Sequence, residues 1–130
     1  MNADMALNWI IETPLILRDL TGVAVLLRLL LATLVGGLIG WERGRHGRAA
    51  GLRTHIMVCL GACLASMLGM YTSTVLGMDG DPNRVAAQVI SGIGFLGVGT
   101  IIVGRSSQVT GLTTAAGLWA TASIGLALGT

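Results

Sequence analysis

The sequence predicts an all-α fold: a polytopic transmembrane helical bundle of about four spans, closely packed through glycine. Three long blocks carry no Asp, Glu, Lys or Arg, namely Thr54–Met78, Val85–Val103 and Ser106–Thr130. A fourth apolar block, Val23–Trp41, contains a single charge at Arg28. A helix needs about 20 largely apolar residues to cross a bilayer core, and each block meets or nearly meets that length. Glycine makes up 20 of the 130 residues, which suits helices that approach one another closely in lipid.

The composition excludes a soluble globular class and favours helices over a membrane barrel. Hydrophobic residues make up 53% of the chain, and the mean hydropathy is +0.80. A barrel strand would show about ten residues of alternating polarity, whereas these blocks are much longer and do not alternate. We therefore expect a transmembrane bundle over residues 21–130, with spans at about 22–41, 54–77, 83–104 and 108–129.

The distribution of charge predicts the orientation of these spans. Four basic residues lie in the loop at 42–53, and all four are Arg: Arg43, Arg45, Arg48 and Arg53. Short basic loops stay in the cytoplasm, so we expect this loop and Arg105 inside, and the N-terminus with Asp79 and Asp81 outside. Residues 1–20 lack the pattern of a removable signal peptide, and we expect them to form an N-terminal segment at the outer interface.

Small residues recur at every fourth position in three of the spans. Such a row lies on one helix face and lets two backbones approach in lipid. Rows of this kind pack helices within one chain or join copies into a homo-oligomer, and the sequence leaves both open. The rows are Ala32, Gly36 and Gly40 in span one, Gly61, Ala65 and Gly69 in span two, and Thr113, Gly117, Thr121, Gly125 and Gly129 in span four.

Span three holds a cluster of four glycines, at Gly92, Gly94, Gly97 and Gly99. Gly92 to Gly97 matches G-x-G-x-x-G, but a dinucleotide site needs a preceding strand and an acidic residue about 20 positions later. The sequence has neither. The cluster instead predicts close approach by a neighbouring helix, with a locally unwound helix, of the kind that forms ion sites in transporters, as the alternative.

Two sets of side chains have residue types that bind metals. Asp79 and Asp81 suit a mostly hydrated Mg²⁺, whereas an EF-hand is excluded because glycine is missing at its sixth position. Asp81 and the proline after it are also typical of a helix start. His55, Cys59 and Cys63 fall on one helix face and suit Zn²⁺ or Cu⁺. We favour packing for the two thiols, because three ligands in line on one helix seldom meet one ion.

Arg28 is the one charge expected inside a span. A charge in lipid is costly unless it pairs or reaches the surface. By the predicted orientation, Asp79 and Asp81 lie on the same side and are candidate partners. The alternative is that span one begins later and that Arg28 lies at the surface.

Two more polar residues have expected roles inside the bundle or at its edge. Glu42 is the only acid in the basic loop, and we expect it to pair with Arg43 or Arg53. Gln88, the only amide in span three, is expected to cross-link helices.

Because the sequence shows neither a catalytic triad nor a nucleotide loop, it predicts a protein that is not an enzyme and binds no nucleic acid.

Four ordered motifs resemble those of the MgtC/SapB membrane proteins. They are Gly36–Arg43, Arg48–His55, Arg84–Gly97 and Gly111–Trp119, and the resemblance runs from about Arg28 to Gly129. The family's motif positions fall here on Glu42, Arg43, Gly51, Arg53, Arg84, Gln88, Gly92, Gly97, Gly111 and Thr113.

The resemblance implies a multi-pass protein of the bacterial inner membrane, tied to Mg²⁺ homeostasis, low-Mg²⁺ adaptation and virulence-related survival inside host cells. It implies a non-enzymatic regulator that acts through membrane protein partners such as the F-type ATP synthase, with Mg²⁺ as a ligand or signal rather than a resident cofactor. The alternatives are a component that transports Mg²⁺ or another small solute, and a module that binds membrane lipids or phosphate through Arg45 and Arg48. Family members usually carry a fifth span and many a cytoplasmic C-terminal domain, so we expect the printed sequence to lack its natural continuation.

Overall fold

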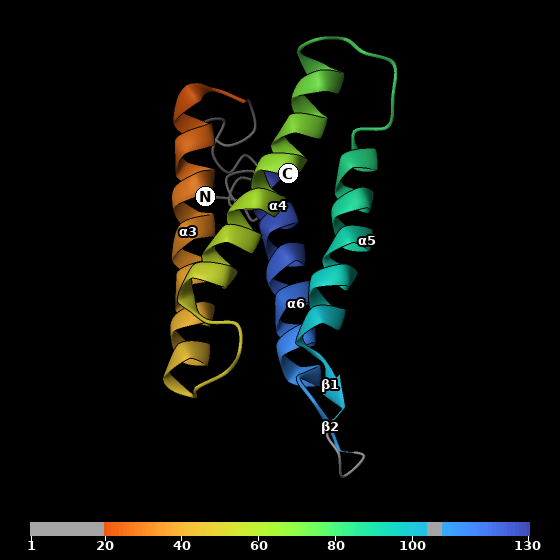
Figure 1. Ribbon diagram of the computed structural model, residues 1–130. Coiled ribbons are helices and arrows are strands. Elements are labelled where there is room, and N and C mark those ends of the chain that lie inside the picture. The colour runs from red at the N-terminus through yellow and green to blue at the C-terminus, as the bar shows by residue number, and fades with distance from the viewer. Residues whose placement is uncertain (1–19, 104–107) are drawn as a thin grey trace, which may run out of the picture.

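Four helices lie side by side in the computed structural model, which describes residues 20–103 and 108–130 (Figure 1). They are α3 (Gly22–Arg45), α4 (Leu52–Thr74), α5 (Asn83–Thr100) and α6 (Leu112–Gly129). Among the described residues, α3, α4 and α6 are long and apolar enough to cross a membrane. The predicted all-α membrane bundle is confirmed. The predicted interfacial segment, up to residue 19, and Arg105 lie outside the described residues.

The helices begin and end within a few residues of the predicted spans. The first helix begins where the Thr21 hydroxyl accepts a hydrogen bond from the Ala24 N–H at 3.3 Å, as an N-cap does. It continues to Arg45, past the predicted end of the span, because the basic residues of its last turn suit the negative end of a helix. The third helix ends at Thr100, earlier than predicted, because the chain there turns into a short hairpin.

This hairpin joins α5 to α6 and was not predicted. Strands β1 (Ile102–Val103) and β2 (Val109–Thr110) pair antiparallel, with Ile102 opposite Thr110. Two residues per strand are too few for an alternating pattern, so no pattern in the sequence indicated these strands. Gly111 follows directly with φ +90° and forms the N-cap of α6.

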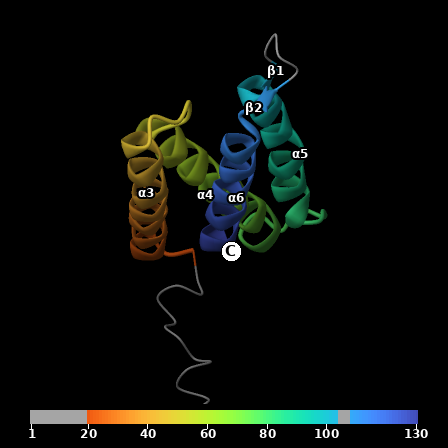
Figure 2. The ribbon, with the colours of Figure 1, turned by 90° about the horizontal axis from the view of Figure 1, so that it is seen from below.

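The two middle helices, α4 and α6, contact each other, while α3 and α5 lie on opposite sides of them (Figures 1 and 2). The two clusters of buried apolar residues consist of small or medium side chains: Ala32, Cys59, Ala62, Cys63, Met67, Ile93 and Ala122. Large apolar side chains such as Leu34 and Phe95 point outward instead. This inversion is typical of membrane helices, since lipid solvates leucine well and close backbone approach drives association.

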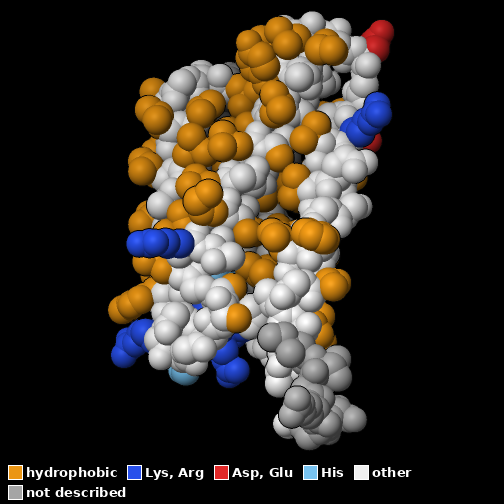
Figure 3. Space-filling view, viewed as in Figure 1, with side chains coloured by type: hydrophobic (Ala, Val, Ile, Leu, Met, Phe, Trp, Pro, Cys, Tyr) orange, Lys and Arg blue, Asp and Glu red, His pale blue; other side chains and the backbone are white. Residues whose placement is uncertain are grey.

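Charged side chains gather at the two ends of the bundle (Figure 3). We call one the basic end: it is where α3 ends and α4 and α6 begin, and it carries the exposed Arg45, Arg48 and Arg53. The other, the acidic end, is the loop between α4 and α5 with the exposed Asp79 and Asp81. The separation agrees with loops on opposite sides of a membrane, and which end faces the cytoplasm stays a prediction.

Candidate functional site

The small-residue row of α3 packs directly on α4. A Cβ atom on Gly36 would lie 2.7 Å from the His55 carbonyl oxygen, and one on Gly40 would lie 2.7 Å from Leu52 Cα. Ala32, the third member of the row, is fully buried. The row therefore serves contact within one chain, and any side chain larger than hydrogen at either glycine would push the two helices apart.

The row of α6 packs on α4 as well, and both rows contact Cys59. A Cβ atom on Gly125 would lie 2.9 Å from Ala62 Cβ, and one on Gly129 would lie 2.7 Å from Ser66 Cβ. Thr121 is fully buried, and its hydroxyl donates to the Gly117 carbonyl oxygen at 2.8 Å. Thr113, at the start of the row, is exposed. Four of the five predicted members thus lie toward the bundle.

The row predicted for α4 packs within the chain at only one of its two glycines. Gly61 has no neighbour within 4 Å of an added Cβ atom, and only Gly69 makes a close contact, with the Pro82 carbonyl. The face of α4 that contacts α3 and α6 instead carries His55, Cys59 and Cys63, all fully buried. The sequence placed these three residues on one helix face and favoured packing for the two cysteines, which the structure bears out.

The same three side chains were candidates for a metal site. Within the described part of the chain, no three His, Cys, Asp or Glu side chains are grouped closely enough to hold an ion. Cys59 packs against Gly36, and the backbones of Cys59 and Cys63 contact Gly125 and Gly129. The packing interpretation is therefore the one that the structure supports.

Arg28 is buried within the bundle, with 5% of its surface exposed. Its Nη1 donates to the Gly129 carbonyl oxygen at 2.6 Å, which joins α3 to the last turn of α6. The expected pairing with Asp79 or Asp81 was wrong, because both aspartates lie exposed in the loop between α4 and α5. The alternative of a surface Arg28 was wrong as well.

In that loop, Asp81 forms a hydrogen bond to a residue close to it in the sequence. The Asp81 carboxylate accepts a hydrogen bond from the Asn83 N–H at 2.9 Å, at the start of α5. The N-cap position itself is held by Pro82, one residue later than predicted. A Mg²⁺ site at Asp79 and Asp81 stays a prediction.

Glu42 does not pair with an arginine. Its carboxylate lies 3.2 Å from His46 Nδ1, one turn along the chain, and both side chains are exposed. The expected pairing with Arg43 or Arg53 was wrong, because a partner four residues away on the same helix lies closer. The Arg43 side chain is half-buried, with its Nε and Nη2 atoms inside the protein.

Arg43, His55 and Gly117 come together in a buried polar cluster at the basic end, which we call the Arg43–His55 cluster. A Cβ atom on Gly117 would lie 3.7 Å from His55 Nε2, 3.9 Å from Arg43 Nη2 and 4.0 Å from Arg43 Nε. These three nitrogen atoms are buried and have no hydrogen-bond partner among the residues that the structure describes. The cluster lies where the last turn of α3 meets the first turns of α4 and α6.

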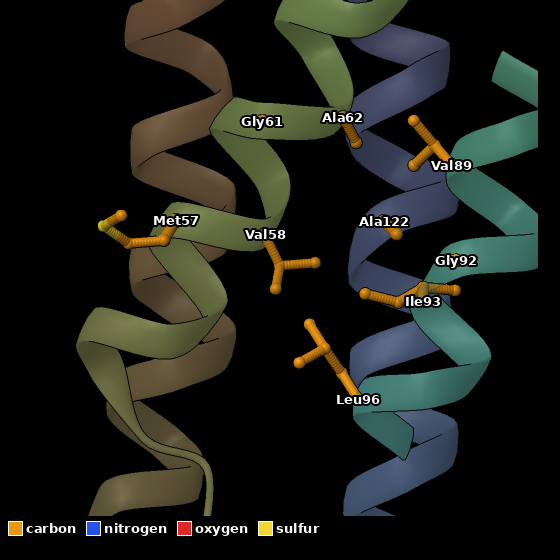
Figure 4. Close-up of a pocket in the computed structure, with 9 residues that line it drawn as sticks. All are labelled: Met57, Val58, Gly61, Ala62, Val89, Gly92, Ile93, Leu96 and Ala122. Atoms are coloured by element: carbon orange, nitrogen blue, oxygen red, sulfur yellow. The ribbon is translucent and has the colours of Figure 1, made fainter. Parts of the chain in front are cut away.

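The groove between α4 and α5 is apolar (Figure 4). It has a cavity volume of about 380 Å³, and Val58, Val89, Ile93 and Leu96 converge on it, while the Met57 side chain points away. The remaining lining residues are small: Gly61, Ala62, Gly92 and Ala122. The groove offers shape and apolar contact but no hydrogen-bonding side chain.

The glycine-rich helix α5 is continuous from Asn83 to Thr100, so the unwound alternative was wrong. Close packing, the favoured prediction, holds for Gly97, whose added Cβ atom would lie 3.4 Å from Ala115 Cβ. Gly92, Gly94 and Gly99 have no neighbour within 4 Å. Most of the cluster therefore lies on an open face.

A comparison with known protein families identifies the family to which the chain belongs. A sequence model of the MgtC family matches residues 29–130. The chain belongs to the MgtC family. It is 50% identical over 98 residues to Protein MgtC of Brucella abortus, covering 75% of this chain and 39% of that protein. It is 47% identical over 104 residues to Protein MgtC of Salmonella typhimurium LT2, covering 80% of this chain and 42% of that protein.

A third relative has a name that states a transport role. It is the Escherichia coli K12 protein named "Putative magnesium transporter YhiD", 45% identical over 108 residues, with 80% of this chain and 50% of that protein covered. The chain thus spans half the length, or less, of these curated relatives. No solved structure matches the chain.

Most of the MgtC motif positions gather at one end of the molecule. Six of the ten lie where α3 ends and α4 and α6 begin: Glu42, Arg43, Gly51, Arg53, Gly111 and Thr113. Gly97, near the end of α5, faces α6. Arg84, Gln88 and Gly92 are exposed along the rest of α5. The motifs therefore form two regions, the basic end and the open face of α5.

Sequence reasoning placed Arg43 among the motif residues but missed its pairing in space with His55. The two lie on different helices, and the glycine that makes room for them lies on a third. A signal was present: His55 follows a small-residue loop at the start of a span, where the sequence suggested only a metal ligand.

Proposed function

We propose that this MgtC-family membrane protein is a non-enzymatic regulator in Mg²⁺ homeostasis that acts by binding another membrane protein through the open face of α5. The single observation that carries the proposal is the character of this face. Gln88 is exposed there, Gly94 and Gly99 have open space, and Phe95 is 83% exposed. In the same proposal the basic end faces the cytoplasm of a bacterial inner membrane.

Membrane physics supports a protein partner for this face. An amide that faces lipid has no hydrogen-bonding partner, whereas an amide at a helix interface bonds across it. Glycines beside Gln88 let a second helix come close enough for that bond. The exposed positions of α3 carry large leucine side chains, such as those of Leu30 and Leu34, and that helix contains no amide side chain.

The transport alternative finds support in the name of the Escherichia coli relative. As a mechanism within one copy, it calls for a polar path that links Arg28, Gln88 and an opened α5. Arg28 lies on α3 and donates to Gly129, α5 is an unbroken helix, and the groove beside α5 is apolar. These observations favour the regulator over a channel through a single copy.

The test is partner capture with Gly94→Leu. This variant adds a side chain on the open face of α5, where nothing within 4 Å opposes it, so the protein should fold normally. We expect cross-linked partners, among them the F-type ATP synthase, to be lost with Gly94→Leu and retained with the control Leu34→Phe on α3. Retention of every partner by Gly94→Leu would contradict the proposal.

A second measurement separates regulator from transporter. Purified protein in proteoliposomes loaded with a Mg²⁺ dye is compared with the Arg28→Ala/Gln88→Ala double variant. The regulator predicts no protein-dependent flux in either case. Flux that the double variant abolishes would instead support transport.

A further inference from the structure

The apolar groove between α4 and α5 has room for a large side chain brought in from outside. Its volume is about 380 Å³ (Figure 4). An apolar cavity of about 150 Å³ is enough to hold benzene, so a phenyl ring fits this groove. Small residues keep the space open, because Gly61, Ala62, Gly92 and Ala122 all line it.

Phe95 carries a ring of that size on the outside of the same helix. It is 83% exposed, more than any other large apolar side chain of the described residues. It does not line the groove of its own copy. Its neighbours along the chain do: Gly92 precedes it by three residues and Leu96 follows it directly. The ring and the groove therefore lie within one helical turn of each other along the axis of α5.

This equal depth matters because two copies in one membrane have the same orientation, which the charges of their loops set in the same way. A twofold axis that relates such copies runs across the membrane, and residues of the two copies meet at equal depth. The exposed Phe95 ring of each copy then lies at the depth of the other copy's groove. A twofold pair can thus fill both grooves at once.

The side of α5 between the ring and the groove allows the close approach that this arrangement needs. At 100° per residue, Gly92 and Gly99 lie between Phe95 and Leu96 around the helix. Neither glycine has a neighbour within 4 Å of an added Cβ atom, so a second helix can come close there. Gln88 lies on the same side and is exposed. Its amide both donates and accepts, so it matches the same amide of a second copy.

The charges at the start of α5 are complementary under the same symmetry. Asp81 and Arg84 are exposed, and neither forms an ion pair within the described part of the chain. In a twofold pair the arginine of each copy faces the acidic loop of the other, so the attraction occurs twice. Exposed ion pairs contribute little affinity, but they disfavour arrangements that place like charges together.

We infer that a second copy of this chain docks on the groove side of α5, with the Phe95 ring of each copy in the groove of the other. A lipid acyl chain also fits an apolar groove, but it offers no partner to the Gln88 amide. The inference does not depend on the partner proposed above. Gly94, which tests that partner, is two residues from Gly92 and so lies on nearly the opposite side of α5.

The experiment measures energy transfer between copies of the whole purified chain in phosphatidylcholine liposomes, as the protein-to-lipid ratio is lowered. The chain has no lysine, so amine-reactive donor and acceptor dyes label the N-terminus alone. We expect saturable transfer, which Phe95→Ala and Gly92→Leu each weaken by at least about tenfold in apparent affinity. Two matched controls should change it by less than about twofold: Gly94→Leu, the same change at a glycine that also has open space, and Val98→Ala, at another exposed apolar position.

A charge exchange tests the twofold symmetry. Arg84→Asp alone places like charges together in a pair of identical copies, and so does Asp81→Arg alone. A mixed pair with one copy of each variant restores both contacts. We expect transfer between the two variants to be at least about threefold stronger than transfer within either one.

Three outcomes would overturn the inference. One is transfer at the level expected for random encounters, which would leave the groove to lipid. Another is saturable transfer that neither Phe95→Ala nor Gly92→Leu weakens, since the copies would then meet through a different surface. The third is an equal loss from Gly94→Leu and Gly92→Leu. Because the purified sample contains no other protein, none of these results bears on partner capture, which is scored separately.

Discussion

The α3–α4–α6 core and helix α5 use the same residue type for opposite purposes. In the core, Gly36 and Gly125 bring backbones so close that a Cβ atom would overlap a neighbouring helix. On α5, Gly94 and Gly99 have no neighbour within 4 Å. Glycine density in a membrane helix therefore does not identify a buried face. It identifies a face that another backbone can approach, whether or not that backbone belongs to the same chain.

The two regions also differ in how they are held. A hydrogen bond from Arg28 to the Gly129 carbonyl joins α3 to α6, and small residues of both helices pack on α4. Helix α5 packs through Gly97 against Ala115 and otherwise borders an apolar groove. We expect the core to resist substitution and α5 to tolerate it, and the four predictions below test that contrast.

The largest effect is expected at the centre of the core. Gly125→Leu forces a side chain into the backbone of α4 at Cys59 and into Ala62, and neither can move away cheaply. Overpacking of this kind should destabilise the protein by at least about 3 kcal/mol. Thermal and dodecyl sulfate unfolding of the purified protein measure the loss. A near-normal transition would show that the core is looser than described.

The junction between the two regions should be the next most sensitive position. Gly111 has φ +90°, and an added Cβ atom would overlap the Thr100 carbonyl group, so Gly111→Ala should cost about 2 kcal/mol. Gly47→Ala is the matched control, because Gly47 has φ +62° but open space around it. Equal losses at both positions would mean that backbone strain alone matters and that the contact with Thr100 does not.

A smaller loss is expected when the polar contact across the core is removed. Arg28→Met keeps much of the side chain's length but leaves the Gly129 carbonyl without the Arg28 donor. Hydrogen bonds to charged groups contribute about 1.5 kcal/mol or more, so we expect a loss of that order in the same unfolding assay. A variant as stable as the parent would indicate that the desolvation of the guanidinium cancels its bond.

The smallest effect is expected on the open face. Gly94→Leu meets no neighbour and should change the free energy of unfolding by less than about 0.5 kcal/mol. The measurement is paired with Gly125→Leu, which makes the identical chemical change in the core. Comparable destabilisation by the two variants would remove the distinction between the regions.

The sequence was sufficient to predict the fold and part of the packing. Long apolar blocks, uncharged except for Arg28 in the first, located α3, α4 and α6, because a bilayer sets a minimum length for an apolar helix. The rows through Gly36 and Gly125 were found because small residues at every fourth position have few other uses in lipid. Both features are encoded by side chains that follow one another along a single helix.

The contacts that could not be predicted join residues on different helices, and such contacts produce no pattern along the sequence of any one helix. Arg28 bonds a backbone carbonyl, and every residue offers one, so its partner could not be predicted. Arg43, His55 and Gly117 come together from three different helices, so no pattern along a single helix predicts the cluster. The contact face of α4 was predicted only in part, because packing was favoured for the two cysteines while the small-residue row was expected at Gly61, Ala65 and Gly69.

The two buried cysteines provide this protein with a built-in reporter. Cys59 and Cys63 are free thiols, fully buried on the face of α4 where α3 and α6 pack. A membrane-permeant thiol reagent can reach them only when those helices separate, so its reaction rate measures how often the core opens. Without any engineered cysteine, this rate thus shows whether a partner bound to α5 makes the separation of the core helices rarer or more frequent.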